Sequence, residues 1–152
     1  MTQKRANVFG LGLIGGSLGL ALSSRGWHVT GCDSVGDIER EALSLGVIHQ
    51  IGVDKDADIT FVATPVSSIA EQVVRALAET TGLVTDVGGV KAHLVGQIND
   101  PRFIGGHPMA GSELIGLAGA DAKLFESAVW VLTPSVGISD SNFEQVAGVV
   151  TE

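Results

Sequence analysis

One histidine in this chain lies among residues with small side chains or none. His107 lies within GGHPMAGSE (residues 105–113), directly after Gly105 and Gly106 and before Pro108. An imidazole titrates near neutral pH, so it can accept a proton from a substrate. The glycines leave room for a sheet edge and a flat ligand ring to approach, and the proline stiffens the turn. Two interpretations follow: a loop histidine that satisfies its own hydrogen bonds, or a histidine that acts on a ligand.

A glycine-rich loop near the start of the chain has the spacing of a phosphate-binding motif. In GLGLIG, Gly10, Gly12 and Gly15 follow the pattern G-x-G-x-x-G between an expected strand and an expected helix. The first glycine allows a tight turn, the second lets the backbone approach a pyrophosphate, and the third packs the helix against the strand. Free N–H groups at the helix N-terminus then attract the phosphates. The alternative is a glycine-rich turn that binds nothing.

An acidic residue follows where the adenosine ribose of a dinucleotide is expected. Asp33 ends the second expected strand, about 20 residues after the glycine loop. A carboxylate at this position accepts hydrogen bonds from the ribose hydroxyls and repels a 2'-phosphate. We therefore predict NAD as the cofactor, and NADP is the less favoured alternative because Ser34 and Arg40 could accommodate a phosphate.

The elements that must position these residues alternate along the chain. Short β-branched runs are separated by longer segments of helical period. This pattern predicts an α/β fold, a Rossmann-type doubly wound, mostly parallel sheet with helices on both faces. Gly16 and Gly19 lie inside the first helix, where a glycine costs about 0.8–1 kcal/mol relative to alanine, so we expect a close backbone contact there. The expected strands cover residues 6–10, 27–33, 58–64, 82–87, 102–106 and 128–133, and the expected helices cover residues 13–26, 37–46, 66–77, 90–98 and 142–150.

Composition and charge argue against several classes of partner. Nine Lys and Arg residues against 17 Asp and Glu residues give a net charge of -8, which disfavours nucleic acid and anionic membrane surfaces. The single cysteine, Cys32, cannot form an internal disulfide, and no unbroken run of about 18 apolar residues occurs. We therefore expect a cytoplasmic protein with a small-molecule substrate. We expect no metal site, because His28, His49 and His93 lack metal-ligand spacing.

These residues lie in segments that resemble the prephenate and arogenate dehydrogenases of tyrosine biosynthesis. The resemblance covers nearly the whole chain in the family's order, and its second half is the more specific part. It implies an NAD(P)-dependent oxidative decarboxylation, in which prephenate gives 4-hydroxyphenylpyruvate or arogenate gives tyrosine. The sequence does not choose between these substrates. The matching segments are GLGLIGGSLGLAL (10–22), Asp33, FVATPV (61–66), TDVGGVK (85–91), FIGGHPMAGSE (103–113) and LFESAVWVLTP (124–134).

The resemblance also implies roles for individual residues. His107 matches the family's catalytic histidine, and we expect it to be the hydrogen-bond acceptor or general base toward the substrate's ring hydroxyl. Ser112 and Glu113 match positions near the substrate or at its entrance, and we expect them to open a helix on the substrate side. Lys91 is either a surface lysine or, from its place at a strand-to-helix junction, a residue with a substrate or structural contact. The expected cofactor-binding residues are Gly10, Leu11, Gly12, Leu13, Ile14, Gly15, Asp33, Ala63, Thr64 and Pro65.

Two departures from the family pattern limit these expectations. Many members have a serine that assists the histidine at the position of Gly89. Members normally continue into a helical domain that forms the homodimer and binds the substrate carboxylates, whereas residues 1–152 are expected to form one dinucleotide-binding domain. The expected helix 142–150 then has nothing to pack against, and Phe125 and Trp130 belong to the core or to the surface that would face that domain.

Three functional interpretations remain open on these grounds. In the first, the chain is the cofactor-binding domain of a tyrosine-pathway dehydrogenase, poorly active or inactive in isolation. In the second, it is a non-catalytic dinucleotide-binding module or a shortened relative, which the missing serine and missing helical domain favour. In the third, it is a hydroxyacid dehydrogenase of another family, which GGHPMAGSE fits poorly.

Overall fold

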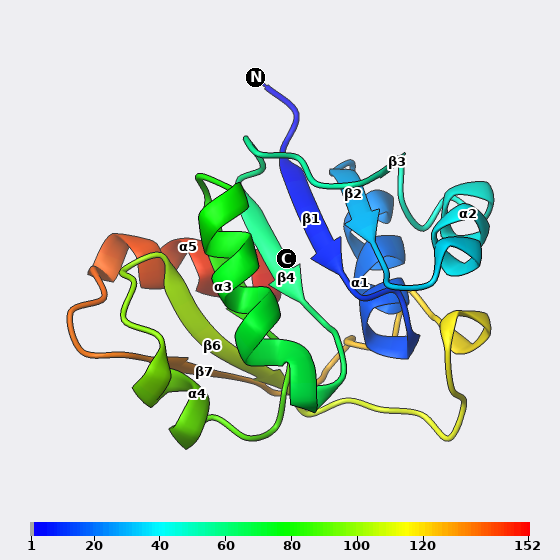
Figure 1. Cartoon of the computed structure of the whole chain (residues 1–152). Coiled ribbons are helices and arrows are strands. Elements are labelled where there is room, and N and C mark those ends of the chain that lie inside the picture. The colour runs from blue at the N-terminus through cyan, green and yellow to red at the C-terminus, as the bar shows by residue number, and fades with distance from the viewer. Residues whose placement is uncertain (1) are drawn as a thin grey trace.

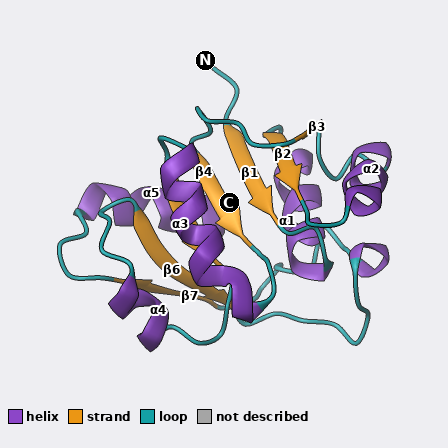
Figure 2. Ribbon diagram, viewed as in Figure 1, coloured by secondary structure: helices purple, strands orange, loops and turns teal. Residues whose placement is uncertain are grey.

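A seven-stranded sheet forms the centre of the structure, a computed structural model that describes residues 2–152. The strand order is β3-β2-β1-β4-β5-β6-β7, and neighbouring strands are parallel except β6 and β7, which are antiparallel. The expected doubly wound, mostly parallel α/β fold is therefore confirmed (Figure 2). The strands are β1 (Arg5–Phe9), β2 (His28–Cys32), β3 (Gln50–Ile51), β4 (Ile59–Val62), β5 (Leu83–Asp86), β6 (Phe103–Pro108) and β7 (Trp130–Pro134).

Helices cover both faces of this sheet. In Figure 1, α3 and α4 lie in front of the sheet and α1 and α5 lie behind it. Right-handed crossover connections require α1 to lie on the opposite face from α3 and α4, whereas α5 follows the last strand. No helix within residues 2–152 combines the length and the apolar surface needed to cross a membrane. The α-helices are α1 (Leu13–Ser24), α2 (Gly36–Ser44), α3 (Ile69–Glu79), α4 (Ala92–Gln97) and α5 (Asp140–Thr151), and two 3-10 turns cover η1 (Val66–Ser68) and η2 (Leu117–Gly119).

Two local differences from the expected elements have simple causes. The short edge strand β3 was not predicted, because its two residues, Gln50 and Ile51, are exposed and too few to form a hydrophobic pattern. The helix expected from Val66 begins as a 3-10 turn and becomes an α-helix at Ile69. The apolar spacing of this segment fits both a 3-10 helix and an α-helix, so it does not show where one changes into the other.

The glycines inside α1 allow the close backbone contact that was expected. A β-carbon at Gly19 would lie 2.5 Å from the carbonyl oxygen of Val47, and one at Gly16 would lie 2.9 Å from Cδ1 of Leu117. A real β-carbon does not approach a carbonyl oxygen this closely, so alanine at Gly19 would push α1 away from the Val47 segment. Close packing therefore offsets the unfavourable helix propensity of these glycines.

The expectation that the last helix has nothing to pack against is wrong. Val146 in α5 is fully buried in the core on the α1 side of the sheet. Asn142 donates to the carbonyl oxygen of Pro101 at 2.8 Å, and Glu152 accepts a hydrogen bond from Trp27 Nε1 at 3.0 Å. The sequence pattern showed the apolar stripe of this helix, but it could not show that the sheet behind β5 and β7 was free to receive it.

Candidate functional site

A cavity of about 730 Å³ opens at the carboxyl ends of the parallel strands. It lies where the strand order reverses between β1 and β4, which is where open α/β sheets bind ligands. The glycine loop after β1, the end of β2, the loop after β4 and the turn after β5 form its walls. Of the expected cofactor-binding residues, those that line it are Gly10, Gly12, Leu13, Ile14, Asp33, Ala63, Thr64 and Pro65.

The other two expected residues, Leu11 and Gly15, support the loop from beneath. The Leu11 side chain is fully buried in the core. Gly15 lies in α1, where a β-carbon would overlap the carbonyl oxygen of Gly10. Gly10 itself has a φ of 89°, and a β-carbon there would lie 2.6 Å from the carbonyl oxygen of Ala63. The loop is therefore packed so tightly against α1 and the end of β4 that glycine is required at both positions.

Gly12 differs from these glycines because no protein atom fills the space beside it. A β-carbon at Gly12 would meet nothing within 4 Å. Gly12 is also the N-cap of α1, and no side chain caps this helix. The first N–H groups of a helix have no intrahelical partners, and the helix dipole places positive charge there. An anion such as a diphosphate fits this open helix end, which borders the cavity.

The Asp33 carboxylate binds two backbone segments. One oxygen accepts from the N–H of Leu11 at 2.8 Å, and the other accepts from the N–H of Val35 at 3.0 Å. A carboxylate has about four acceptor positions, so acceptors remain for the hydroxyls of a ribose. Of the two residues that kept NADP open, Ser34 lines the cavity, whereas Arg40 pairs with Asp37 on the exposed surface of α2 and does not line it.

Several residues of the cavity wall were not predicted. Among them, Arg75 of α3 places its guanidinium 4.9 Å from the ring centre of Phe9 and 3.9 Å from Cys32 Sγ, and its Nε donates to Glu79 at 3.0 Å. Burial raises the pKa of the Cys32 thiol, and Arg75 partly offsets this effect. Arg75 lies three helical turns after Pro65, and a charge on the polar side of an amphipathic helix carries no sequence signal for a site.

His107 lies at the rim of this site, on β6. It is half-buried, and it does not itself line the cavity. Gly89, which does line the cavity, is its neighbour: a β-carbon at Gly89 would lie 3.4 Å from His107 Cε1 and 3.5 Å from its Nε2. Gly105 and Gly106 face protein rather than open space, because a β-carbon at Gly106 would lie 2.7 Å from the carbonyl oxygen of Asp86. The structure thus brings the histidine to the edge of the cavity that the glycine loop opens.

The segment after His107 does not form the expected helix. Ser112 and Glu113 are exposed, and the hydroxyl of Ser112 accepts from the N–H of Leu114 at 3.1 Å, which closes a turn. The prediction of a helix opened by Ser112 is therefore wrong. The physical reason is that Gly111 and Gly116 flank a stretch whose apolar residues, including Ile115 at 87% exposed, find no surface to pack against.

The remaining histidines lie away from this site. His28 and His49 stack with ring centres 5.1 Å apart near the amino ends of β2 and β3, and His93 contacts the Gln97 side chain on α4. Within residues 2–152, no three side chains of His, Cys, Asp or Glu gather closely enough to hold a metal ion.

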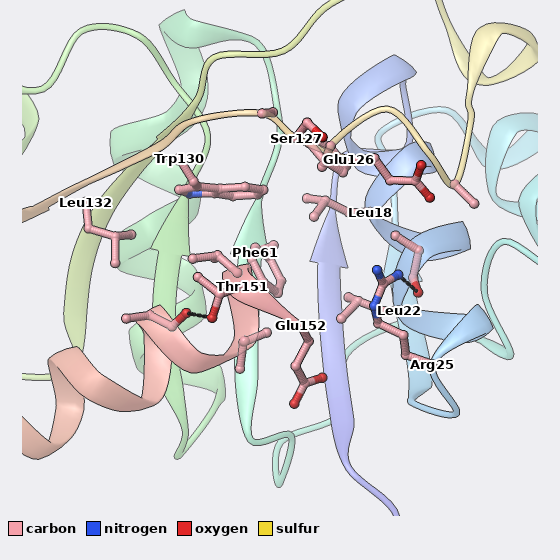
Figure 3. Close-up of a pocket in the computed structure, with 17 residues that line it drawn as sticks. Leu18, Leu22, Arg25, Phe61, Glu126, Ser127, Trp130, Leu132, Thr151 and Glu152 are labelled. Atoms are coloured by element: carbon pink, nitrogen blue, oxygen red, sulfur yellow. Dashed lines mark hydrogen bonds between the residues drawn. The ribbon is translucent and has the colours of Figure 1, made fainter.

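A second cavity, of about 500 Å³, lies on the opposite side of the sheet from α3, between α1 and α5 (Figure 3). Its wall is mostly apolar: Trp130 meets the ring of Phe61 edge to face at 6.3 Å, and Phe125 lies 5.3 Å from Trp130. Phe125 and Trp130 thus pack partly into the core and partly along this groove. Neither the glycine loop nor His107 lines this second cavity, so the cavity is separate from the candidate site.

Comparisons with known proteins agree with this arrangement. The family model "Prephenate dehydrogenase, nucleotide-binding domain" matches residues 18–152. A prephenate dehydrogenase of Bacillus subtilis (strain 168) is 36% identical over 167 residues, and the match covers 99% of this chain and 45% of that protein. A prephenate dehydrogenase of Lactococcus lactis is 34% identical over 146 residues, and the match covers 86% of this chain and 41% of that protein. The chain thus spans less than half the length of these relatives.

Solved structures give the same result at the level of the fold. The crystal structure of prephenate dehydrogenase from A. aeolicus, in complex with hydroxyphenyl propionate and NAD+, matches with a TM-score of 0.89 and 26% identity over 99% of this chain and 57% of that chain. Synechocystis arogenate dehydrogenase matches with a TM-score of 0.89 and 31% identity over 97% of this chain and 56% of that chain. From the fold, the placement of the glycine loop and these matches together, the chain belongs to the family of prephenate dehydrogenase nucleotide-binding domains.

Proposed function

We propose that this chain binds NAD in the 730 Å³ cavity and forms the cofactor-binding half of a dehydrogenase that oxidatively decarboxylates prephenate or arogenate. One observation carries the proposal: a single cavity has an open, uncapped helix N-terminus on one wall and Gly89, the neighbour of His107, on another. The relatives named as prephenate and arogenate dehydrogenases support the choice of reaction. In this arrangement, residues 1–152 act as a single dinucleotide-binding domain.

Each part of the proposed site has a role in this reaction. The N–H groups at the start of α1 hold the diphosphate, Asp33 accepts from the adenosine ribose, and Ala63, Thr64 and Pro65 line the wall after β4. The bound cofactor would supply a hydride acceptor for the ring carbon that carries the substrate hydroxyl. His107 accepts the proton of that hydroxyl, as general base or hydrogen-bond acceptor, and loss of carbon dioxide makes the ring aromatic. Ser112 and Glu113 lie at the entrance on the substrate side.

NADH formation tests this function. The protein that carries this chain in its full natural length is incubated with NAD+ and prephenate, and separately with NAD+ and arogenate. We expect absorbance of NADH to appear with at least one of the two substrates, and the same assay shows which one is preferred. If neither substrate is turned over while NADH still binds, the second candidate function holds, a non-catalytic dinucleotide-binding module, which Gly89 in place of the family's serine favours.

The cofactor preference is a separate prediction. We expect NADH to bind at least about 10-fold more tightly than NADPH, a difference of about 1.4 kcal/mol, because the Asp33 carboxylate would face the 2'-phosphate. Fluorescence titration of this chain with each nucleotide measures the two Kd values. The matched control is Arg40→Ala, which should leave both values unchanged because Arg40 pairs with Asp37 away from the cavity. Tighter binding of NADPH would contradict the role given to Asp33.

Restoring the family's serine should help the reaction. A β-carbon at Gly89 would meet the His107 ring at ordinary contact distance, so Gly89→Ser fits without displacing the ring. Its hydroxyl can then bond to the imidazole, and one added hydrogen bond of about 1 kcal/mol corresponds to an increase of about 5-fold in kcat. Gly89→Ala supplies the same β-carbon without the hydroxyl and is the control. A serine variant no faster than the alanine variant would contradict this expectation.

The assembly and location of the protein are proposals of the same kind. We propose that the homodimer forms through a helical region of the kind the family carries beyond the nucleotide-binding domain. A small-molecule substrate, with no nucleic acid or membrane partner, agrees with the net charge of -8. A cytoplasmic location agrees with the single, buried, unpaired cysteine, Cys32. Sedimentation analysis of the full natural protein and of this chain tests whether the homodimer needs the helical region.

A further inference from the structure

A buried ion pair lies beside His107 and has no part in the chemistry proposed above. Asp86, the last residue of β5, is fully buried, and its carboxylate pairs with Lys91 Nζ next to the start of α4. Burial lowers the pKa of Lys91, and Asp86 acts in the opposite direction. Burying two charges costs desolvation energy that their attraction often fails to recover, so the pair needs an explanation other than stability. Lys91 therefore makes a structural contact and is not a surface lysine.

The Asp86 carboxylate links two backbone segments that meet at the site. Its Oδ1 accepts from the N–H of Gly106 at 3.1 Å, directly before His107. Its Oδ2 accepts from the N–H of Gly88 at 3.0 Å and also bonds to Lys91. One side chain thus holds the turn after β5 and the strand that carries the histidine at a fixed separation.

The sheet does not provide this link. The ladder between β5 and β6 pairs Val84 with Phe103 and Thr85 with Ile104, and it stops there. Beyond that point β6 is held by β7 on its other side, where His107 lies opposite Val131. On the β5 side, the Asp86 side chain takes the place of the missing ladder bonds.

The position of the turn matters because Gly89 borders the imidazole. Gly89 follows the bonded residue Gly88, and a β-carbon built on it would lie 3.4 Å from His107 Cε1. We propose that the Asp86–Lys91 pair is a positioning unit for His107, which fixes the turn at residues 87–91 against the imidazole and so aims the ring at the substrate hydroxyl. The catalytic meaning of this inference rests on the proposed function, but the geometric part does not.

The test begins with a readout that needs neither cofactor nor substrate. In this chain, a nuclear Overhauser effect between the Gly89 α-protons and His107 Hε1 reports their contact. Lys91→Met keeps most of the side-chain volume and leaves the buried Asp86 carboxylate without its counter-ion. We expect the carboxylate then to leave its backbone partners at Gly88 and Gly106, so that this effect is lost while the sheet stays folded. If Lys91→Met does not fold, the double variant Asp86→Asn, Lys91→Met carries the test, because it leaves no unpaired buried charge.

The double variant also separates positioning from stability. We expect its unfolding temperature to recover relative to Lys91→Met. We expect the Gly89–His107 contact to remain lost, because the single carbonyl oxygen of an asparagine cannot replace both carboxylate oxygens. The matched control is Asp54→Asn, which breaks the ion pair with Arg5 at the amino ends of the strands, away from His107, and should lower stability without changing the contact. A contact of native intensity in the folded Lys91 variants, or its loss in Asp54→Asn, overturns the proposal.

Turnover then connects the geometry with the reaction. In the full natural protein, a misaimed general base costs about 10- to 100-fold in kcat, so we expect that loss for the double variant. The Kd for NADH should change much less than kcat, because the Asp86–Lys91 pair does not itself line the cavity and only Val87, Gly88 and Gly89 of the turn border it. A native kcat together with a lost Gly89–His107 contact would overturn the positioning role, whereas the absence of turnover in the unmodified protein would count against the proposed function alone.

Discussion

Replacement of His107 by asparagine is expected to lower kcat by about 100- to 10,000-fold, the range that general bases contribute. Asparagine keeps a similar size and a hydrogen-bonding group, but it cannot accept the proton of the substrate hydroxyl. The Kd for NADH should not change, because His107 does not line the cofactor cavity. Steady-state kinetics of the full natural protein and fluorescence titration of this chain measure the two quantities.

The matched control for this variant is His93→Asn. His93 lies on the exposed side of α4, where its ring contacts Gln97, and it has no role in the proposed site. This variant should therefore keep native kinetics. A His107→Asn protein that turns over as fast as the unmodified protein would remove the role given to His107, even if the reaction itself is confirmed.

Alanine substitutions in the glycine loop are expected to separate ligand binding from folding. Gly12→Ala adds a methyl group into space that holds no protein atom, so the unfolding temperature should stay close to native. The same methyl group lies where the diphosphate would approach the backbone, so we expect NADH binding to weaken by about 10- to 100-fold, or about 1.4–2.8 kcal/mol. Differential scanning calorimetry and fluorescence titration of this chain measure both effects.

The Gly15→Ala variant should instead lose both stability and NADH binding. Its methyl group would overlap the carbonyl oxygen of Gly10, which is itself confined by Ala63. Overpacking of this kind costs about 1–3 kcal/mol of stability or more, and the displaced loop should no longer hold a diphosphate. The control is Gly148→Ala in α5, another helical glycine with open space beside it, which should leave NADH binding unchanged. Native NADH affinity in Gly12→Ala would show that the cofactor does not approach the backbone there.

The sequence predicted those parts of the fold in which the pattern of neighbouring residues reflects where the segment lies in the folded protein. The residues of β4 are all buried, so a nearly all-apolar run identified them. The glycine spacing identified the loop because the motif lies within six consecutive residues, in which Gly15 packs directly on Gly10. These local signals placed the cavity at the correct end of the sheet.

The parts that were missed depend on contacts between distant segments. Nothing near Asp86 in the sequence shows that its carboxylate bonds to Gly106, because that contact exists only after β6 lies beside β5. Arg75 reaches the cavity for the same reason, through the packing of α3 on the sheet. Around Ser112, the capping residue was present but the apolar period that a helix needs was not, and a cap alone does not start a helix.

The double use of Asp33 ties cofactor choice to the integrity of the loop. Its carboxylate, proposed to select NAD, also accepts from the N–H of Leu11 and from the N–H of Val35. A substitution that removes the negative charge to admit a 2'-phosphate therefore also weakens these contacts, because even asparagine keeps only one acceptor oxygen for the two N–H groups. An exchange of NAD for NADP specificity in this fold consequently also alters the backbone contacts that hold the glycine loop and the turn after β2.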